Sequence, residues 1–219
     1  MTRPDDAGEF VSGRLEFDGG RGITAWVPSR PPAAFVFCGD GQLVPTWAAA
    51  VREAGAPPPL IVGLHRVADE TLRLHEYSPR FDPDRFAAHE AAFTDGLRDW
   101  VRDRLGVETP RDRTAIFGVS AGGELALALG LRRPDLYGAI FCASPGGGFR
   151  PPESLPPPLP RTYLTAGLHE PFFLQNAARW AEALRRSGAD VEMTEREGGH
   201  GDDFWRTEFP LMLAWAFAD

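Results

Sequence analysis

The side chain best suited to nucleophilic attack in this sequence is that of Ser120. It stands in the middle of residues 118–122, which read Gly-Val-Ser-Ala-Gly and match the pattern Gly-x-Ser-x-Gly. That pattern forms a sharp turn from a strand into a helix, and the turn exposes the serine at the end of the strand. The apolar run 115–119 precedes Ser120, and apolar residues at helical spacing follow it from position 125. This context predicts a nucleophile rather than an incidental serine in a Gly-rich turn.

A serine hydroxyl attacks poorly unless a neighbouring base takes its proton. Where a turn of this kind carries the serine, an acid and then a histidine follow it along the chain. Of the five histidines only His169 and His200 follow Ser120, and His200 lies in the sequence Gly-Gly-His-Gly after the alternating run 191–195. A histidine on a Gly-rich loop behind the last strand can reach the end of the sheet. We therefore predict that His200 is the general base.

The acid of the site is predicted at Glu170, on the segment after the apolar run 162–166. A glutamate can orient an imidazole as an aspartate does. Glu170 could instead cap the helix that follows it, and a Ser–His pair without a close acid is a second alternative. Asp202 and Asp203 follow His200 by only two and three residues, which places them poorly for contact with its Nδ1 atom.

The backbone N–H of Ala121 is predicted to face the oxyanion that forms during such an attack. Ala121 begins the helix after the serine, and the N–H groups at a helix N-terminus favour negative charge. Metal-dependent hydrolysis has little support, because the sequence contains no spaced ligand motif. We expect no metal and no cofactor.

These residues need a scaffold that brings distant segments to one edge. Short runs that are apolar without alternation suit strands buried on both faces of a parallel sheet. Such runs cover residues 33–38, 60–64, 115–119, 139–143 and 162–166. Helical patterns occupy residues 84–105, 173–187 and 205–217. Strand-like runs at 10–17 and 23–27, joined by Asp18-Gly19-Gly20, predict an N-terminal antiparallel hairpin. The alternation of strands and helices predicts one α/β domain over residues 1–219.

Composition excludes several classes of function. The net charge of −8 argues against a nucleic-acid binder, which needs a basic face. All 23 basic residues are arginines, and the absence of lysine excludes Schiff-base chemistry and a Ser–Lys pair. No apolar run approaches 18 residues and the N-terminus has no signal-like apolar core, so we expect no membrane contact and a cytoplasmic location.

Four segments, taken in order, resemble the esterase D-type esterases of the α/β-hydrolases, a group that includes enterochelin and feruloyl esterases. They are residues 37–42 (Phe-Cys-Gly-Asp-Gly-Gln), residues 73–79 (Arg-Leu-His-Glu-Tyr-Ser-Pro), residues 118–138 around the serine and residues 198–206 around the histidine. The resemblance covers the chain from about residue 33 to its end. It implies an α/β-hydrolase fold with a mostly parallel sheet, helices on both faces and little or no lid.

The resemblance also implies roles for particular residues. Ser120 and His200 match the catalytic residues, Glu170 matches the acid by position, and the backbone N–H of Gln42 matches the second oxyanion donor. The family often has an aspartate directly after the histidine, whereas this chain has Gly201. The chain has little room for the additional N-terminal domain that some siderophore esterases carry. This argues against a siderophore as the substrate.

The expected activity is cleavage of a small-molecule carboxylic ester through an acyl-enzyme on Ser120. Acyl transfer or hydrolysis of a thioester or lactone would use the same residues, and a non-catalytic binding domain on this fold is an alternative of another class. Arg73 and Trp205 are candidate substrate contacts. Arg73 could instead pair with Glu76 or another acid, and Trp205 could simply begin a helix. The sequence does not predict an oligomeric state.

Overall fold

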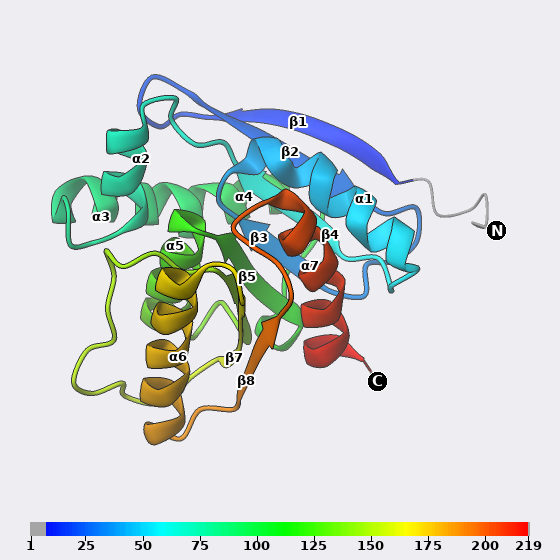
Figure 1. The fold of residues 1–219 in the computed structure, drawn as a ribbon. Coiled ribbons are helices and arrows are strands. Elements are labelled where there is room, and N and C mark those ends of the chain that lie inside the picture. The colour runs from blue at the N-terminus through cyan, green and yellow to red at the C-terminus, as the bar shows by residue number, and fades with distance from the viewer. Residues whose placement is uncertain (1–7, 219) are drawn as a thin grey trace.

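Eight strands form one sheet in the computed structural model, which describes residues 8–218 (Figure 1). The strand order is β1-β2-β4-β3-β5-β6-β7-β8. The strands are β1 (Glu9–Leu15), β2 (Arg21–Val27), β3 (Phe35–Cys38), β4 (Leu60–Leu64), β5 (Thr114–Val119), β6 (Ala139–Ala143), β7 (Arg161–Gly167) and β8 (Val191–Arg196). The predicted hairpin β1–β2 is antiparallel and joins β4 antiparallel, while every pair from β4 to β8 is parallel.

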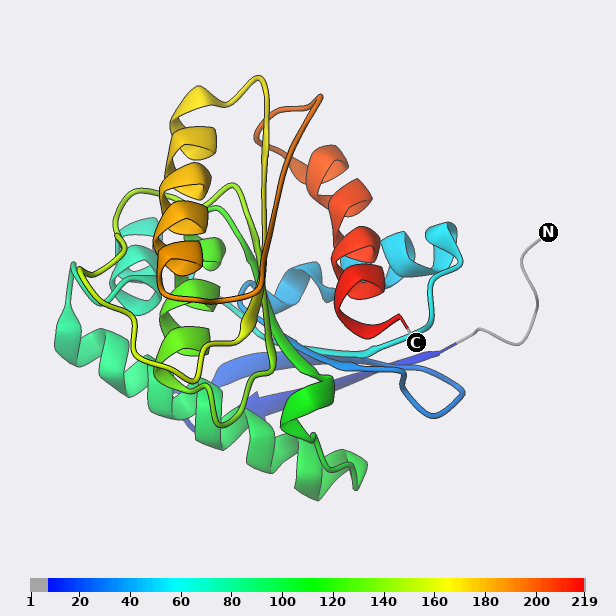
Figure 2. The ribbon, with the colours of Figure 1, turned by 90° about the horizontal axis from the view of Figure 1, so that it is seen from below.

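Helices cover both faces of the sheet. They are α1 (Val44–Ala54), α2 (Glu70–Tyr77), α3 (Pro83–Ala91), α4 (Leu97–Leu105), α5 (Ala121–Arg132), α6 (Pro171–Arg186) and α7 (Asp202–Phe217). Figure 2 shows α1 and α7 together on one face and α4, α5 and α6 on the other. Side chains alternate between these faces along a strand, so neighbours such as Phe37 and Cys38 belong to different apolar cores. Among the described residues, no helix is long and apolar enough to cross a bilayer.

The observed elements confirm the predicted fold, with corrections to the helices. The pattern at 84–105 is not one α-helix, because a π-helical turn (Ala92–Gly96) lies between α3 and α4. Helix α7 begins at Asp202, three residues before the predicted start. Helices α1 and α2 were not predicted, since Pro45 and the charged composition of residues 70–77 mask their periodicity. Gly106 ends α4 at φ 66°, a backbone conformation that suits glycine.

The carboxyl ends of β5, β6 and β7 lie side by side. Val119 pairs with Ala143, and Ala143 pairs with Thr165. Each strand therefore delivers the residues that follow it to the same edge, which is where ligands bind in open α/β sheets. Ser120 follows β5 directly, and Glu170 follows β7 after a short turn.

Candidate active site

Ser120 stands on a strained turn between β5 and α5. Its backbone has φ 57° and ψ −124°, which is unfavourable for a residue with a Cβ atom. The turn is held by a hydrogen bond from the Ser120 N–H to the carbonyl of Ala143 at 3.0 Å. A Cβ atom at Gly118 would overlap the carbonyl of Gly122, so the turn requires glycine there. The predicted strand–turn–helix context of the serine is present.

The serine, histidine and glutamate predicted from sequence form one chain of hydrogen bonds. His200 Nε2 lies 3.0 Å from Ser120 Oγ, and His200 Nδ1 lies 2.7 Å from Glu170 Oε2. When the Nδ1–H of the neutral imidazole donates a hydrogen bond to the Glu170 carboxylate, the Nε2 atom is unprotonated and can accept the serine proton. The arrangement can therefore generate a serine nucleophile at neutral pH.

The carboxylate of Glu170 is buried and has its own donors. Oε1 accepts the Gly167 N–H at 2.7 Å and the Ser144 hydroxyl at 2.6 Å, which leaves Oε2 for His200. Glu170 occupies the N-cap position of α6 but its side chain makes no capping hydrogen bond. The alternative that Glu170 is only a helix cap is therefore wrong. Asp203, in the first turn of α7, is exposed.

The imidazole of His200 is held between two aromatic rings. The ring of Phe173 stacks on it with centroids 3.8 Å apart, and the ring of Trp205 meets it edge-on at 4.9 Å. About a third of the His200 side chain, 32 %, is exposed. The imidazole is thus fixed in orientation by its neighbours while one side stays open to solvent.

The two predicted oxyanion donors lie on separate segments at this edge. Ala121 is the first residue of α5, where N–H groups lack acceptors within the helix. Gln42 lies in the short 3₁₀ turn Gly41–Leu43 after β3. The N–H of Asp40, just before that turn, donates to the Tyr77 hydroxyl at 2.8 Å, so the Asp40 amide is already engaged. Gln42 stays the predicted donor from this turn.

Comparison with known sequences identifies the chain. The profile of a family described as "Putative esterase" matches residues 36–149, which is more than half of the chain and includes Ser120. The chain belongs to this esterase family. It is a carboxylic-ester hydrolase of the α/β-hydrolase fold. A comparison with curated protein sequences finds no match.

Solved structures of esterases share the whole fold of this esterase. A ferulic acid esterase superposes with a TM-score of 0.72 at 15% identity, over 97% of this chain and 98% of its own. An S-formylglutathione hydrolase from Staphylococcus aureus gives 0.71 at 12% identity over 99% of both chains. The enterochelin esterase of Shigella flexneri gives 0.78 at 18% identity, and this esterase matches 99% of its own length to only 60% of that larger chain. At these identities the likeness establishes the fold.

Arg73 does not face the site as a free cation. Its guanidinium binds both oxygens of Asp40, with Nε and Nη2 at 2.9 and 2.8 Å, and the residue is 9 % exposed. This pairing favours the alternative that Arg73 binds an acid of the protein, and a substrate contact by Arg73 stays a prediction. Its main partner is Asp40 and not Glu76, which binds Arg21 and Arg85 instead. The pair fixes the loop that leads into the Gln42 turn.

Trp205 is also buried, at 8 % exposure, and its indole N–H donates to Ser144 Oγ at 2.9 Å. Since α7 begins at Asp202, Trp205 does not start the helix as the alternative had it. The ring contacts His200, which favours a supporting position for Trp205, and a substrate contact by Trp205 stays a prediction. Trp205 therefore packs against the imidazole of His200 and helps to hold it in place.

Sequence reasoning did not find Glu124, which shapes the wall beside Ser120. Its buried carboxylate accepts the N–H groups of Gly148 at 3.1 Å and Phe149 at 2.7 Å. Burial raises the pKa of the Glu124 carboxyl, while the two N–H groups act in the opposite direction. Its sequence context could have indicated it, because Glu124 is a single acid in a helix of small and apolar residues. A carboxylate buried in such a helix needs hydrogen-bond partners.

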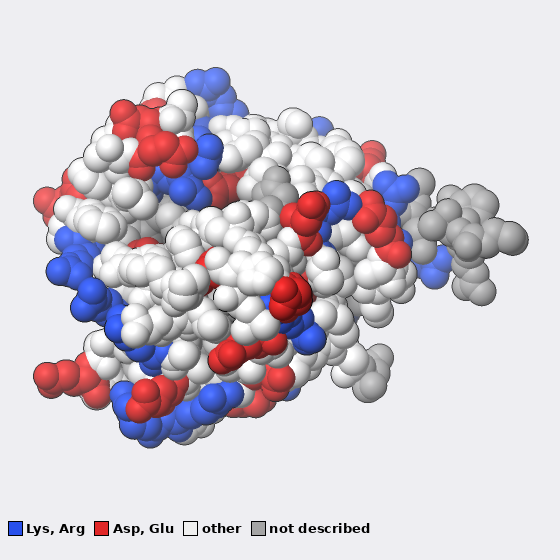
Figure 3. All heavy atoms as spheres, in the orientation of Figure 1, with Lys and Arg blue, Asp and Glu red and all other residues white. Residues whose placement is uncertain are grey.

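Two exposed aromatic rings flank the glycine segment 146–148 that Glu124 helps to hold. A Cβ atom at Gly147 would lie 3.0 Å from the ring of Phe172, and one at Gly148 would lie 2.5 Å from that of Phe81. Both rings are about half exposed, Phe172 at 58 % and Phe81 at 48 %. Figure 3 shows that the middle of the molecular face drawn in Figure 1 is largely uncharged, with acidic residues and arginines around it. The rings thus offer apolar surface on the serine side of the sheet edge.

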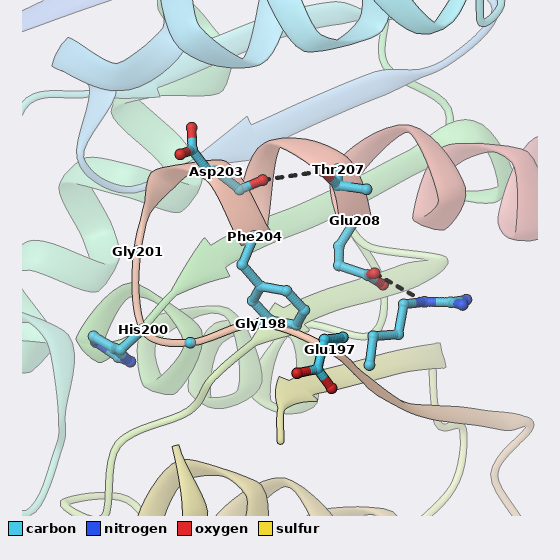
Figure 4. A pocket seen from close by; sticks show the side chains of 10 residues that line it. Glu197, Gly198, His200, Gly201, Asp203, Phe204, Thr207 and Glu208 are labelled. Carbon is cyan, nitrogen blue, oxygen red and sulfur yellow. Dashed lines mark hydrogen bonds and ion pairs between the residues drawn. The ribbon is translucent and has the colours of Figure 1, made fainter. Parts of the chain in front are cut away.

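A separate hollow of about 520 Å³ lies beside the histidine loop. Residues 196–201 and the first two turns of α7 line it, and Ser120 does not. Arg196 Nε lies 2.8 Å from the buried carboxylate of Glu208. Figure 4 shows the imidazole of His200 pointing away from Phe204 and Glu208. The hollow is therefore behind the histidine and separate from the nucleophile.

Proposed function

We propose that this esterase cleaves its substrate through an acyl-enzyme on Ser120, with His200 as general base and acid and Glu170 as the orienting acid. The observation that carries the proposal is the continuous hydrogen-bond chain from Ser120 Oγ through His200 to Glu170 Oε2. The same three residues in this order argue against a non-catalytic binding domain.

In the first half-reaction Ser120 Oγ attacks the ester carbonyl carbon while His200 Nε2 takes its proton. The carbonyl oxygen becomes an oxyanion, for which the N–H groups of Ala121 and Gln42 are the proposed donors. The C–O bond to the alcohol then breaks, and the alcohol leaves with the proton from Nε2. Glu170 stays ionised and stabilises the imidazolium throughout.

In the second half-reaction water gives a proton to His200 Nε2 and attacks the acyl carbon. Collapse of the second tetrahedral intermediate returns the proton to Ser120 and releases the carboxylic acid. The open side of His200, with about a third of its side chain exposed, favours water as the acceptor. This supports hydrolysis over acyl transfer to a second bound substrate.

The proposed substrates are uncharged esters with an apolar group next to the ester bond. The exposed rings of Phe81 and Phe172 support an apolar substrate group. Arg73 supports an uncharged one, because its Nε and Nη2 atoms already bind Asp40 and do not face an anionic substrate group. The test compares kcat/KM for nitrophenyl esters that differ only in an apolar or a carboxylate-bearing acyl tail. We expect at least a tenfold preference for the apolar tail, and an equal or reversed preference would contradict the substrate class.

A fluorophosphonate probe tests the nucleophile directly. We expect labelling of the native protein and none of the Ser120→Ala variant, with ester hydrolysis lost in parallel. Labelling that survives in Ser120→Ala would show that another residue is the nucleophile. Asp103→Asn, on the exposed side of α4, serves as a control that should label as the native protein does.

A further inference from the structure

Ser144 is a buried serine at the end of β6 that links two parts of the site. Its hydroxyl lies 2.6 Å from Glu170 Oε1, and the indole nitrogen of Trp205 lies 2.9 Å from the same hydroxyl. Ser144 has no exposed surface, and Trp205 is 8 % exposed. Ser144 therefore meets the acid at the oxygen that does not bind His200, and Trp205 reaches the acid only through Ser144.

The donor and acceptor properties of the three groups determine the direction of these hydrogen bonds. An indole N–H can only donate, so the Ser144 oxygen is its acceptor. The hydroxyl proton of Ser144 is then directed to the carboxylate of Glu170, which as an ionised group can only accept. Each donor polarises the next, so Trp205 strengthens the bond that Ser144 gives to the acid. With Gly167 as the other donor, Oε1 has two partners and Oε2 is left for His200.

The backbone at Ser144 is held in an unfavourable conformation to place this hydroxyl. Its φ of 50° lies in the left-handed region, which serine rarely adopts. Its N–H donates to the carbonyl of Thr165 on β7 at 2.8 Å, so the strain is maintained by the neighbouring strand. Strain of this kind is unfavourable and often marks residues with a functional task.

Trp205 contacts both ends of the His–Glu pair. Its ring edge meets the His200 imidazole at 4.9 Å and 83°, while its N–H reaches Glu170 through Ser144. A shift of Trp205 would therefore disturb the imidazole and the carboxylate together. This geometry distinguishes it from the many core residues that only fill space.

We propose that Ser144 and Trp205 are positioning residues that fix the orientation and charge of Glu170, and through it those of His200. The proposal rests on the proposed triad mechanism. In it Ser144 stabilises the ionised carboxylate and prevents Oε1 from exchanging places with Oε2. Neither residue touches the substrate.

The test uses Ser144→Ala, Ser144→Gly and Trp205→Phe, measured on a nitrophenyl ester. Glycine removes the hydroxyl and also relieves the φ of 50°, so Ser144→Gly should fold well. Phenylalanine keeps an aromatic ring against His200 but removes the N–H. We expect kcat to fall about tenfold to a hundredfold in both serine variants and less in Trp205→Phe, with KM within about twofold.

A second readout separates positioning from a merely structural role. Loss of a donor leaves more negative charge on the carboxylate, which favours the protonated imidazole. The acid limb of kcat/KM should therefore move to higher pH in all three variants. Trp47→Phe, which truncates a buried tryptophan of α1 that packs on Phe117 and Phe209, should lower the melting temperature without moving that limb.

A double-mutant cycle with Glu170→Gln completes the test. If Ser144 acts through Glu170, Ser144→Ala should cost little further activity in the Glu170→Gln background. Equal losses in both backgrounds, or Ser144 variants with native kcat and an unmoved acid limb, would overturn the proposal. A Glu170→Gln variant with native activity would instead contradict the proposed role of Glu170 as the acid. The failure of the positioning proposal and the failure of the proposed mechanism are therefore distinguishable.

Discussion

Glu170 Oε2 lies 2.7 Å from His200 Nδ1 although Glu170 occupies the N-cap position of α6, where an acidic side chain often bonds to the helix itself. The turn that carries it folds back, with the Glu170 N–H donating to the carbonyl of Gly167 at 3.2 Å. The first turn of α6 therefore gives up a side-chain cap so that the carboxylate can face the histidine loop.

This relationship predicts the effect of Glu170→Gln. An amide cannot stabilise the imidazolium, so kcat should fall by about 10²- to 10⁴-fold with little change in KM. A residue that acted only as a cap would instead lower stability by about 1 kcal/mol and leave kcat unchanged. Steady-state kinetics and a urea unfolding curve on the same preparation distinguish the two.

The strained turn at Ser120 predicts that activity and stability respond in opposite directions. Ser120→Gly removes the nucleophile and also relieves a φ of 57°. We expect hydrolysis to be abolished and the free energy of unfolding to rise by about 0.5–1 kcal/mol. A decrease in the free energy of unfolding would show that the Ser120 side chain contributes more to the fold than its backbone strain costs.

Activity should depend on pH through the protonation of His200. The base must be neutral before attack, because only an unprotonated Nε2 atom can accept the serine proton. We expect kcat/KM to rise with pH through a single-proton limb, in both acylation and deacylation. A flat profile from about pH 5 to 9 together with an active His200→Ala variant would rule this base out.

Stability should depend on pH through a different histidine. His89 is fully buried among the rings of Phe17, Tyr77 and Phe93, and burial lowers its pKa to about 4. Between about pH 6.5 and 4 the unfolded chain binds a proton that the folded chain does not, so stability falls as the pH falls through this window. The loss amounts to about 2–3 kcal/mol, from roughly 1.4 kcal/mol per pKa unit.

Urea unfolding at several pH values measures that loss. In His89→Leu, which cannot take up a proton, the fall in the free energy of unfolding between pH 6.5 and 4 should be smaller by the same amount. Equal slopes in the native protein and the variant would assign the acid sensitivity to other groups, such as the buried cluster of Glu76, Arg21 and Arg85.

The buried pair of Arg73 and Asp40 predicts a stability effect and not a binding effect. Arg73→Gln leaves a buried carboxylate without its counter-charge, which costs about 3–5 kcal/mol. We expect a large drop in melting temperature and a lower kcat as the Gln42 turn loosens. Unchanged stability with only a raised KM would support Arg73 as a substrate contact.

Ser120 and His200 could be predicted from the sequence because each lies in a recognisable local pattern of neighbouring residues. Ser120 has glycines on both sides where backbones nearly touch, and His200 lies in a loop of glycines after the last strand. The continuous apolar runs likewise predict the parallel strands, because a strand buried on both faces must be apolar throughout. These signals require no knowledge of distant contacts.

Residues whose role depends on a distant partner could not be assigned in this way. Ser144 follows an apolar strand and has no local feature that points to Glu170, which is 26 positions away. Arg73 has acids nearby in sequence, yet its main partner is Asp40, which is 33 positions away. Such assignments depend on the strand order, because the order decides which loop ends meet at the sheet edge.

The proline-rich segment 150–160 divides the functional groups into two sets. Ser120 and Ser144 precede it, whereas Glu170, His200 and Trp205 follow it. A chain cut in this segment would yield one fragment that holds the proposed nucleophile and another that holds the proposed base and acid. Neither fragment could turn over an ester alone, so hydrolysis would report directly on whether the two halves had reassembled along the β6–β7 seam.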